Sequence, residues 1–251
     1  MLIQFFLTLV ISAISSCPEN TETTAEGALD QIESVQITSL TANIFYTRTD
    51  PILDRREIRT GRLLFQKSEG NREAAILFDT LIIGRRRETK QKHYIFSGRW
   101  MAEVDHDKKQ FIKRELVRPD QDDIDPFELG SGPIPLPIGQ SKESVLKKFV
   151  VTLVEKPTEG PLEKLDDTVV GLHLIPKTND EWEYINLFYD IKTWLPVGVE
   201  SVEIDGTKRV SRLSNMQIDI LSDEEASFLN IATPDPKIWS IDVQKLQVPT
   251  K

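Results

Sequence analysis

Apolar and polar residues alternate with period two from His93 to Val117, and this pattern predicts three consecutive strands. The first strand runs into the turn pair Ser97-Gly98, and the second begins at Trp100. The polar run Asp105 to Lys108 suits a second turn, after which apolar residues carry a third strand. The stretch is therefore expected to form an antiparallel meander.

The same period recurs over most of the chain. Leu40 to Tyr46 predicts a long strand, and Asp205-Gly206 is typical of a two-residue hairpin turn. Further strands are expected at 58–67, 74–83, 150–154, 169–175, 183–191, 196–204 and 208–221, with a final strand-like segment or tail at 238–248. Together these elements predict a mainly β (α+β) fold with an antiparallel sheet of about ten strands.

Short helices are expected at three places. Thr24 is a suitable N-cap for a helix from about Ala25 to Val35, whose apolar positions share one face and would cover a sheet. Ser141 likewise precedes a helical pattern that ends near Phe149. A third, very short helix is expected to begin after a cap at Ser222.

The stretch 126–139 is apolar, yet its prolines and glycines bar a regular helix or a central strand. An irregular apolar segment must be covered or must itself cover something. Together with the helix that follows, the segment Pro126 to Phe149 is interpreted as a lid. An ordinary surface connection with a packed helix explains the local pattern equally well.

The first sixteen residues carry no charged side chain, and their apolar run is too short for a transmembrane helix, which is typical of a secretory signal. Residues 14–17 resemble the lipobox of bacterial lipoproteins, in which the cysteine is lipidated, and Cys17 is the only cysteine. Cleavage after the small-x-small pattern at 13–15 is the alternative, because a basic residue before the apolar run is missing. We expect a signal peptide at 1–16, a linker at 17–24 and a single domain at 25–251.

Composition restricts the class of partner. The chain has 40 acidic and 31 basic residues and a net charge of −9, so as a whole it repels nucleic acid and anionic surfaces. The basic run 84–92 has no interleaved aromatic residues, which favours a solvated hairpin tip over a patch for nucleic acid or acidic lipid. No nucleic-acid partner is expected.

Residues suited to catalysis or metal binding are few. The three histidines lack the spacing of metal ligands, and the sequence has no nucleophile-elbow motif. The acidic run 120–125 lacks the glycine and the distal glutamate that a helix-loop-helix calcium site requires. We therefore expect no catalytic residue, no metal site and no cofactor.

Four short motifs occur along the chain in the order and at the spacing of one known family. They are Gly61 to Lys67 (GRLLFQK), Phe96 to Trp100 (FSGRW), Leu172 to Lys177 (LHLIPK), and Ala226-Ser227-Phe228 followed by Pro234. From about Ala25 to Asp235 the chain resembles the bacterial outer-membrane lipoprotein carriers (LolA/LolB-like), a group that includes lipoprotein-sorting proteins.

This resemblance implies a curved antiparallel sheet of about ten or eleven strands that forms an incomplete (half) β-barrel, with short helices covering its concave face. Acyl chains of lipoproteins or lipids would occupy the concave cavity. The residues expected to line that cavity are Phe65, Phe78, Phe96 and Trp100. The lid residues expected to face it are Phe127, Leu136, Ile138, Leu146 and Phe149.

Lid closure is the point at which this chain departs from the family pattern. The family often has an Arg-Pro pair after the second strand, whose arginine controls closure, and the matching positions here are Lys67 and Ser68. A lysine can donate to the backbone carbonyls of a lid but lacks the planar fork of arginine. Lys67 is therefore the candidate residue for lid closure, and we expect it to hold the lid less tightly than an arginine would.

The resemblance implies a non-enzymatic carrier or acceptor that binds acyl chains at the cell envelope, in lipoprotein sorting or localisation. The expected partners are lipoproteins or lipids as cargo and an envelope membrane partner. The protein is expected to be an exported, periplasmic monomer, membrane-anchored if Cys17 is lipidated. The alternative is an envelope regulatory or stress-sensing module that uses the same half-barrel, and a co-purifying acylated ligand would separate the two.

Overall fold

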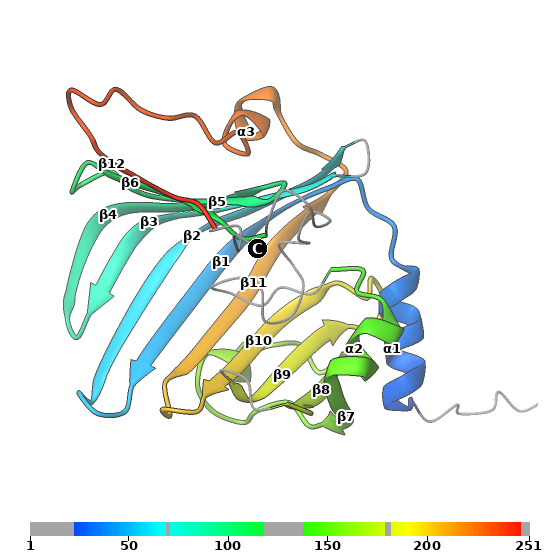
Figure 1. The fold of residues 1–251 in the computed structure, drawn as a ribbon. Coiled ribbons are helices and arrows are strands. Elements are labelled where there is room, and N and C mark those ends of the chain that lie inside the picture. Colours follow the sequence, from blue (N-terminus) through cyan, green and yellow to red (C-terminus); the bar gives the residue numbers. More distant parts are fainter. Residues whose placement is uncertain (1–22, 69–70, 118–137, 179–181, 247–251) are drawn as a thin grey trace, which may run out of the picture.

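The computed structural model describes residues 23–68, 71–117, 138–178 and 182–246, and these form one twelve-stranded sheet (Figure 1). Its strands lie in the order β12-β6-β5-β4-β3-β2-β1-β11-β10-β9-β8-β7. All neighbouring strands are antiparallel except β12 and β6, which are parallel. The bounds are β1 Ser39–Asp50, β2 Arg55–Ser68, β3 Asn71–Ile83, β4 Arg86–Ser97, β5 Trp100–Asp105, β6 Gln110–Glu115, β7 Phe149–Val154, β8 Val169–Pro176, β9 Trp182–Asp190, β10 Pro196–Glu203, β11 Lys208–Ile218 and β12 Ser240–Gln244.

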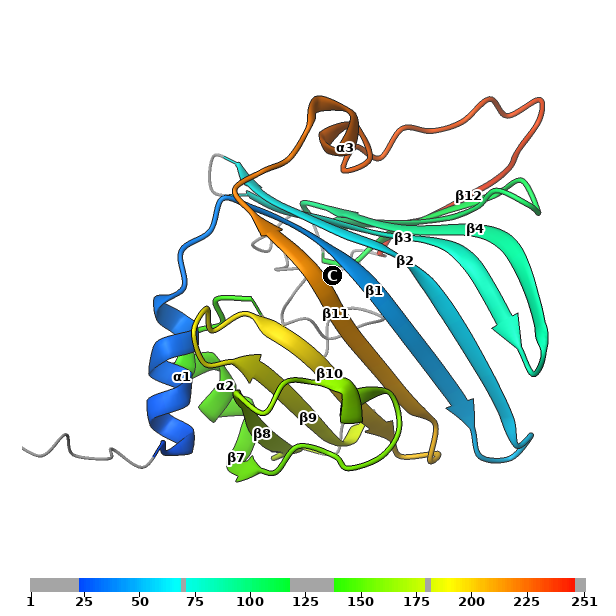
Figure 2. The same ribbon diagram turned by 180° about the vertical axis from the view of Figure 1, so that it is seen from behind.

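The sheet is strongly curved and does not close on itself, so that β12 and β7 are its two ends (Figures 1 and 2). The mainly β half-barrel predicted from the sequence is confirmed, with twelve strands in the described part of the chain in place of ten or eleven. The meander predicted from His93 to Val117 is confirmed as the end of β4 followed by β5 and β6.

Two irregularities in strand register help the sheet to bend. The pairing of β2 with β3 shifts between Thr60 and Gly61, and the pairing of β3 with β4 shifts between Phe78 and Thr80. A Cβ atom at Gly61 would lie 1.9 Å from the Leu77 carbonyl oxygen. Glycine is therefore required where the backbones of β2 and β3 approach each other most closely.

The basic run 84–92 corrects one expectation. Only the turn at Gly84 and Arg85 forms a hairpin tip, and β4 starts at Arg86. Arg86 and Arg87 at the start of β4 are exposed, and after them the partly buried Glu88, Lys90 and Lys92 alternate with the exposed Thr89 and Gln91.

All three predicted helices are present. Helix α1 (Ala25–Ser34) begins after Thr24, whose side chain accepts a hydrogen bond from the Gly27 amide, and α2 (Lys142–Lys148) begins after Ser141. Helix α3 (Asp223–Ser227) has a reciprocal capping box between Ser222 and Glu225. A 3-10 turn, η1, spans Pro161–Lys164. Among the described residues, no helix has both the length and the apolar character that crossing a membrane requires.

The sheet is covered on both faces. Helices α1 and α2 stand at the concave side beside β7–β10, whereas α3 lies over the convex side of β2–β5 (Figures 1 and 2). On the convex side, Phe228, Leu229 and Trp239 of the C-terminal segment pack on a small cluster of apolar residues from β2 to β6. The predicted C-terminal strand is confirmed as β12, which pairs with β6 after the chain has crossed this face.

Candidate binding groove on the concave face

The strand register places apolar residues of neighbouring strands side by side on the concave face of the sheet. In the β1–β2 pair, Leu40 lies opposite Phe65 and Ala42 opposite Leu63. In the β3–β4 pair, Ala74 lies opposite Phe96. Each of these side chains is at most 3% exposed. Residues two apart on one strand share a face, so one register places the whole set on the same side.

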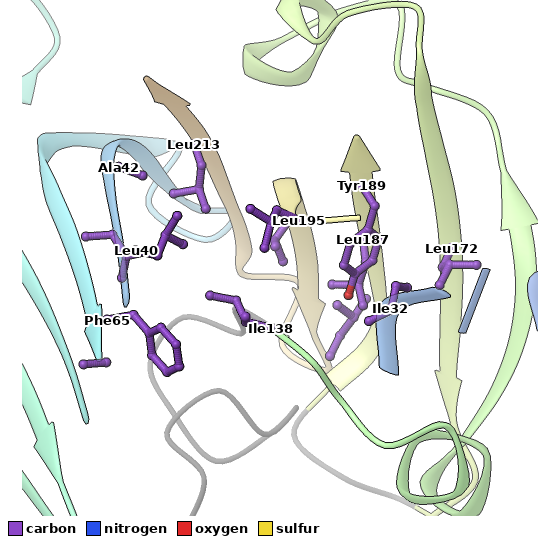
Figure 3. Packing of buried hydrophobic residues seen from close by; sticks show 14 of the residues in the cluster. Ile32, Leu40, Ala42, Phe65, Ile138, Leu172, Leu187, Tyr189, Leu195 and Leu213 are labelled. Atoms are coloured by element: carbon purple, nitrogen blue, oxygen red, sulfur yellow. The ribbon is translucent and has the colours of Figure 1, made fainter. Parts of the chain in front are cut away.

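A second apolar wall faces the first across the curve of the sheet. It consists of Leu172, Leu187 and Tyr189 from β8 and β9, with Ile32 from α1 (Figure 3). Both walls belong to one continuous cluster of buried residues, which spans β1–β4, β8–β11 and the two helices. These side chains therefore form one contiguous hydrophobic core inside the curve of the sheet.

The lid segment enters the space between the two walls. Ile138 lies between Phe65 on one side and Leu187 on the other in Figure 3, and it is 2% exposed. Leu146 of α2 is partly buried against the same cluster, and Phe149 is 3% exposed within it. The other two predicted lid residues, Phe127 and Leu136, lie outside the described residues.

Phe149 is part of the sheet itself. It follows α2 as the first residue of β7, where its backbone lies opposite Pro176 of β8. Its place in the groove wall is therefore fixed by strand pairing, because a residue in a paired strand cannot leave without breaking that pairing. Of the predicted lid, only the segment that precedes β7 could move without breaking the pairing of β7 with β8.

Three of the four predicted cavity residues lie on the concave face. Phe65, Phe78 and Phe96 all belong to its apolar cluster. The expectation for Trp100 is corrected by the register. Its neighbour Met101 lies opposite Phe96 and packs on the concave cluster, so Trp100 alternates to the convex side. There its ring receives the ammonium group of Lys113, 4.6 Å from the ring centre.

The lid segment is held by an arginine that sequence reasoning missed. The Arg72 guanidinium donates from Nη1 to the Ile138 carbonyl (3.1 Å) and from Nη2 to the Gly139 carbonyl (3.4 Å). Arg72 lies directly opposite Lys67 in the β2–β3 pair. The side chain of Lys67 is exposed and makes no hydrogen bond or ion pair with another described residue. At the position of Lys67 an arginine would be expected to donate two hydrogen bonds to the lid. Here Arg72, on the neighbouring strand β3, donates them instead.

Gly139 makes this grip sterically feasible. Its φ of +59° lies in the left-handed region, and a Cβ atom there would come within 3.3 Å of Arg72 Nη2. The same Cβ would come within 3.4 Å of the Val35 carbonyl oxygen at the end of α1. The lid segment thus passes through a narrow space between α1 and Arg72, and only glycine fits there without displacement.

Helix α2 is tied to its neighbours by lysines. Lys142 Nζ lies 2.9 Å from Asp30 Oδ1 on α1, and the pKa of Lys142 is raised, mainly by this hydrogen bond. Lys177, just after β8, donates from Nζ to the Leu146 carbonyl at 2.5 Å. Exposed contacts of this kind are individually weak, so they orient α2 without fixing it permanently.

A cavity of about 490 Å³ lies beside β11 and the start of β10. Apolar side chains such as Leu195, Leu213 and Met216 form part of its wall. Its charged lining is mixed, with Lys164, Lys192 and Arg212 beside Asp166 and Asp190, which leaves an excess of one positive charge.

Groups that could perform chemistry are sparse in the described part of the chain. No three histidine, cysteine, aspartate or glutamate side chains gather there in a way that could hold a metal ion. The acidic run 120–125 lies outside the described residues. His93 and His106 are close to each other, but on the convex face beneath the C-terminal segment.

Comparison with known proteins gives similarity of fold at low sequence identity. No family model matches the chain, and no curated protein matches it. Among solved structures, the MucA/MucB complex of Pseudomonas aeruginosa is 11% identical, with a TM-score of 0.43, over 83% of this chain and 61% of that one. The match therefore spans less than two thirds of that protein's chain.

Two other solved structures are matched over nearly their whole length. An outer membrane lipoprotein-sorting protein domain from Vibrio parahaemolyticus is 11% identical, with a TM-score of 0.37, over 82% of this chain and 100% of that one. A LolA superfamily protein from Nitrosomonas europaea is 12% identical, with a TM-score of 0.32, over 81% and 97%. These TM-scores are below 0.5, so the likenesses carry no argument about function.

Proposed function

We propose that this chain is a non-enzymatic carrier or acceptor of acyl chains at the cell envelope, which holds lipoprotein or lipid cargo in the concave groove. The observation that carries the proposal is the single apolar cluster that lines both walls of the half-barrel and includes Ile138 of the lid segment. A surface of this kind binds by removing methylene groups from water and needs no directional chemistry.

The magnitude of this effect is sufficient. Each methylene group taken out of water contributes about 0.8 kcal/mol, so ten of them contribute on the order of 8 kcal/mol before the entropic costs of binding. A single acyl chain therefore supplies enough free energy for reversible binding, and a second chain would make the binding stable.

Entry of cargo requires the lid segment to move, because Ile138 occupies the space between the walls. Its tether is the pair of hydrogen bonds from Arg72 to backbone carbonyls. Bonds from a charged donor contribute about 1.5–3 kcal/mol each, an amount that an entering acyl chain can replace. Cargo and Ile138 would thus exchange places in the groove, and release would reverse the exchange.

We further propose that the protein acts after export. The uncharged apolar stretch 1–16 would be removed, and Cys17 would either carry the lipid anchor or remain a free thiol. The expected partners are then lipoproteins or lipids and a membrane protein of the envelope, with the carrier itself a monomer.

Native mass spectrometry of the full-length protein purified from membranes tests the carrier function. The expected spectrum contains adducts with the masses of acylated ligands, and these adducts are displaced by a fluorescent fatty-acyl probe. A spectrum without acylated adducts, combined with no binding of the probe, would rule out carriage. In that case a regulatory module on the same half-barrel becomes the better hypothesis.

A further inference from the structure

The concave face changes character along its strands. On β1, the apolar positions Leu40, Ala42 and Ile44 are followed on the same face by Tyr46 and then Arg48. The strand register brings charged partners to this end, since Arg48 lies opposite Arg209 on β11 and opposite Glu57 on β2. The groove therefore has an apolar end near the lid segment and a charged end at the far rim.

A cavity of about 410 Å³ lies at the charged end. Its described lining residues include four cations and one carboxylate, namely Arg48, Arg59, Lys92, Arg209 and Glu57, together with Tyr46, Phe78 and Tyr94. With Glu103 and Glu203, which pair with Lys92 and Arg209, the site has four positive and three negative charges, and it retains a net positive charge in a chain whose net charge is −9.

Three aromatic rings form the floor of this rim cavity. The Tyr46 and Phe78 ring centres are 5.6 Å apart, and Phe78 meets Tyr94 edge to face at 6.3 Å. Phe78 lies opposite Gly61, where the backbones of β2 and β3 are close together. The floor residues pack in the same apolar cluster that lies on the concave face.

Three of the four cations are held in position by carboxylates. Arg59 Nε lies 2.6 Å from Glu57, Lys92 Nζ 2.6 Å from Glu103, and Arg209 Nε 2.5 Å from Glu203. The Arg59 and Lys92 side chains are only 15% and 22% exposed. A guanidinium has five donors; Arg59 contacts Glu57 through Nε, whereas Arg209 contacts Glu203 through Nε and Nη2 and also bonds Tyr46.

Arg48 differs from the other three cations. It lies on the exposed rim of the same face, and it makes no hydrogen bond or ion pair with another described residue. An exposed arginine beside three positioned cations, over an apolar floor, presents its donors to whatever enters the cavity.

We propose that this rim cavity is a subsite for an anionic headgroup of the phosphate or phosphonate type, and that the preferred cargo is an anionic amphiphile. Its acyl chain would lie along the apolar groove, and its headgroup would reach Arg48, Lys92 and Arg209. The proposal rests on the carrier function for the groove itself and adds the class of cargo.

The test compares two amphiphiles with the same chain. Oleoyl lysophosphatidate carries a phosphate headgroup and monooleoylglycerol a neutral one, and each is titrated against the full-length protein by displacement of a fluorescent fatty-acyl probe. The wild-type protein should bind the phosphate form more tightly, by about tenfold or more, because charge-assisted hydrogen bonds to partly buried cations are strong.

Variants localise the effect. Arg48→Gln and Lys92→Gln should each weaken lysophosphatidate binding about fivefold to tenfold and leave monooleoylglycerol binding unchanged. Arg56→Gln is the matched control, because Arg56 is an exposed arginine of β2 whose register with Thr49 places it on the opposite face. It should bind both amphiphiles as the wild type does, and thermal unfolding of all three variants separates loss of binding from loss of fold.

The outcomes distinguish the two proposals. Equal affinity of the wild type for both amphiphiles overturns the subsite but leaves the carrier function intact, whereas binding of neither overturns the carrier function. Inorganic phosphate alone should compete only weakly with lysophosphatidate. If it competes at comparable concentrations and the glycerol form does not bind, the cavity is a site for a small anion, and the amphiphile proposal is wrong.

Discussion

His106 Nε2 and His93 Nδ1 lie 3.1 Å apart on the convex face, so the two imidazoles share one hydrogen bond beneath the C-terminal segment. The His93 ring meets Phe228 edge to face, and the His106 ring meets Trp239 in the same way. The shared bond requires one nitrogen to accept, so protonation of both rings breaks it. The pair therefore couples the attachment of this segment to pH.

Acidification should loosen the C-terminal segment. Burial and the neighbouring His106 lower the pKa of His93 to about 4, with Asp79 opposing them. Burial and Lys109 lower the pKa of His106, against Asp105 and Asp107. Both folded-state pKa values are below the unfolded value near 6.5, so their stabilisation is complete above that pH and is lost as the pH falls towards 4. The loss should be on the order of 1 kcal/mol, because the rings are partly screened by solvent.

Limited proteolysis within 219–239, measured from pH 7 to pH 4 by mass spectrometry, follows this loosening. Cleavage should rise as the pH falls in the wild type and should depend little on pH in His93→Gln. A wild-type cleavage rate that is flat over this range would show that the histidine pair does not control the segment.

Removing the Arg72 tether should open the groove. Arg72→Gln loses the charged donor to the Ile138 and Gly139 carbonyls, and so the lid segment should open more often. We expect faster association of the acyl probe in stopped-flow measurements, by roughly threefold to tenfold. Lys67→Gln, in the opposite register position, is the control and should leave the association rate unchanged. An equal effect of both substitutions would point to general charge loss as the cause.

A charge placed on the lid side of α2 should weaken cargo binding more than it weakens the fold. Leu146 is only partly buried against the concave cluster, so Leu146→Asp should reduce acyl-probe affinity about tenfold with a small change in thermal midpoint. Val150→Asp is the nearby control, because Val150 is 51% exposed on β7. If the thermal midpoint of Leu146→Asp collapses while the remaining folded protein binds the probe normally, Leu146 belongs to the core and has no part in the lid.

The bend at Gly61 gives a prediction about stability. Gly61→Ala places a methyl group 1.9 Å from the Leu77 carbonyl oxygen, so β2 and β3 must separate. We expect a loss of about 2 kcal/mol or more in the free energy of unfolding, measured with urea. In Gly84→Ala the added carbon has no atom within 4 Å. We expect this variant to lose only about 1 kcal/mol, because alanine is strained at the positive φ of this position. Equal losses in both variants would contradict the close approach.

Removal of the N-terminal segment is tested by intact-mass analysis of the native protein. The expected mass lacks residues 1–16, with Cys17 at the new N-terminus and carrying a lipid. Retention of residues 1–16 would disprove export, whereas an unmodified or missing Cys17 would disprove lipidation alone.

The strands and caps could be predicted because their signals are local. The period-two pattern in Leu40 to Tyr46 and the capping residues Thr24 and Ser222 determine conformation within a few neighbouring residues. Trp100 was placed on the wrong face because the turn before it fixes the register, and a shift of one residue moves every side chain to the other side.

Arg72 and the rim cations could not be predicted from sequence for a related reason. Arg72 becomes a tether only because it is paired opposite Lys67 and approaches Gly139, a residue 67 positions away along the chain. Arg48 and Arg209 are 161 positions apart and meet only because β1 pairs with β11. Contacts of this kind can be recognised only once the strand order is known, because the two partners lie far apart in the sequence.

The parallel pairing of β12 with β6 has a consequence for solubility. An open sheet has two edge strands whose unpaired amide and carbonyl groups can recruit another chain. β12 pairs with β6 over five residue pairs and is itself the edge strand, so loss of the C-terminal segment would move this edge to β6 without touching the concave face. The opposite edge, β7, is six residues long and is preceded by Lys147 and Lys148. Both edges of the open sheet are therefore short strands, of five residues in β12 and six in β7, which limits the backbone surface that another chain could pair with.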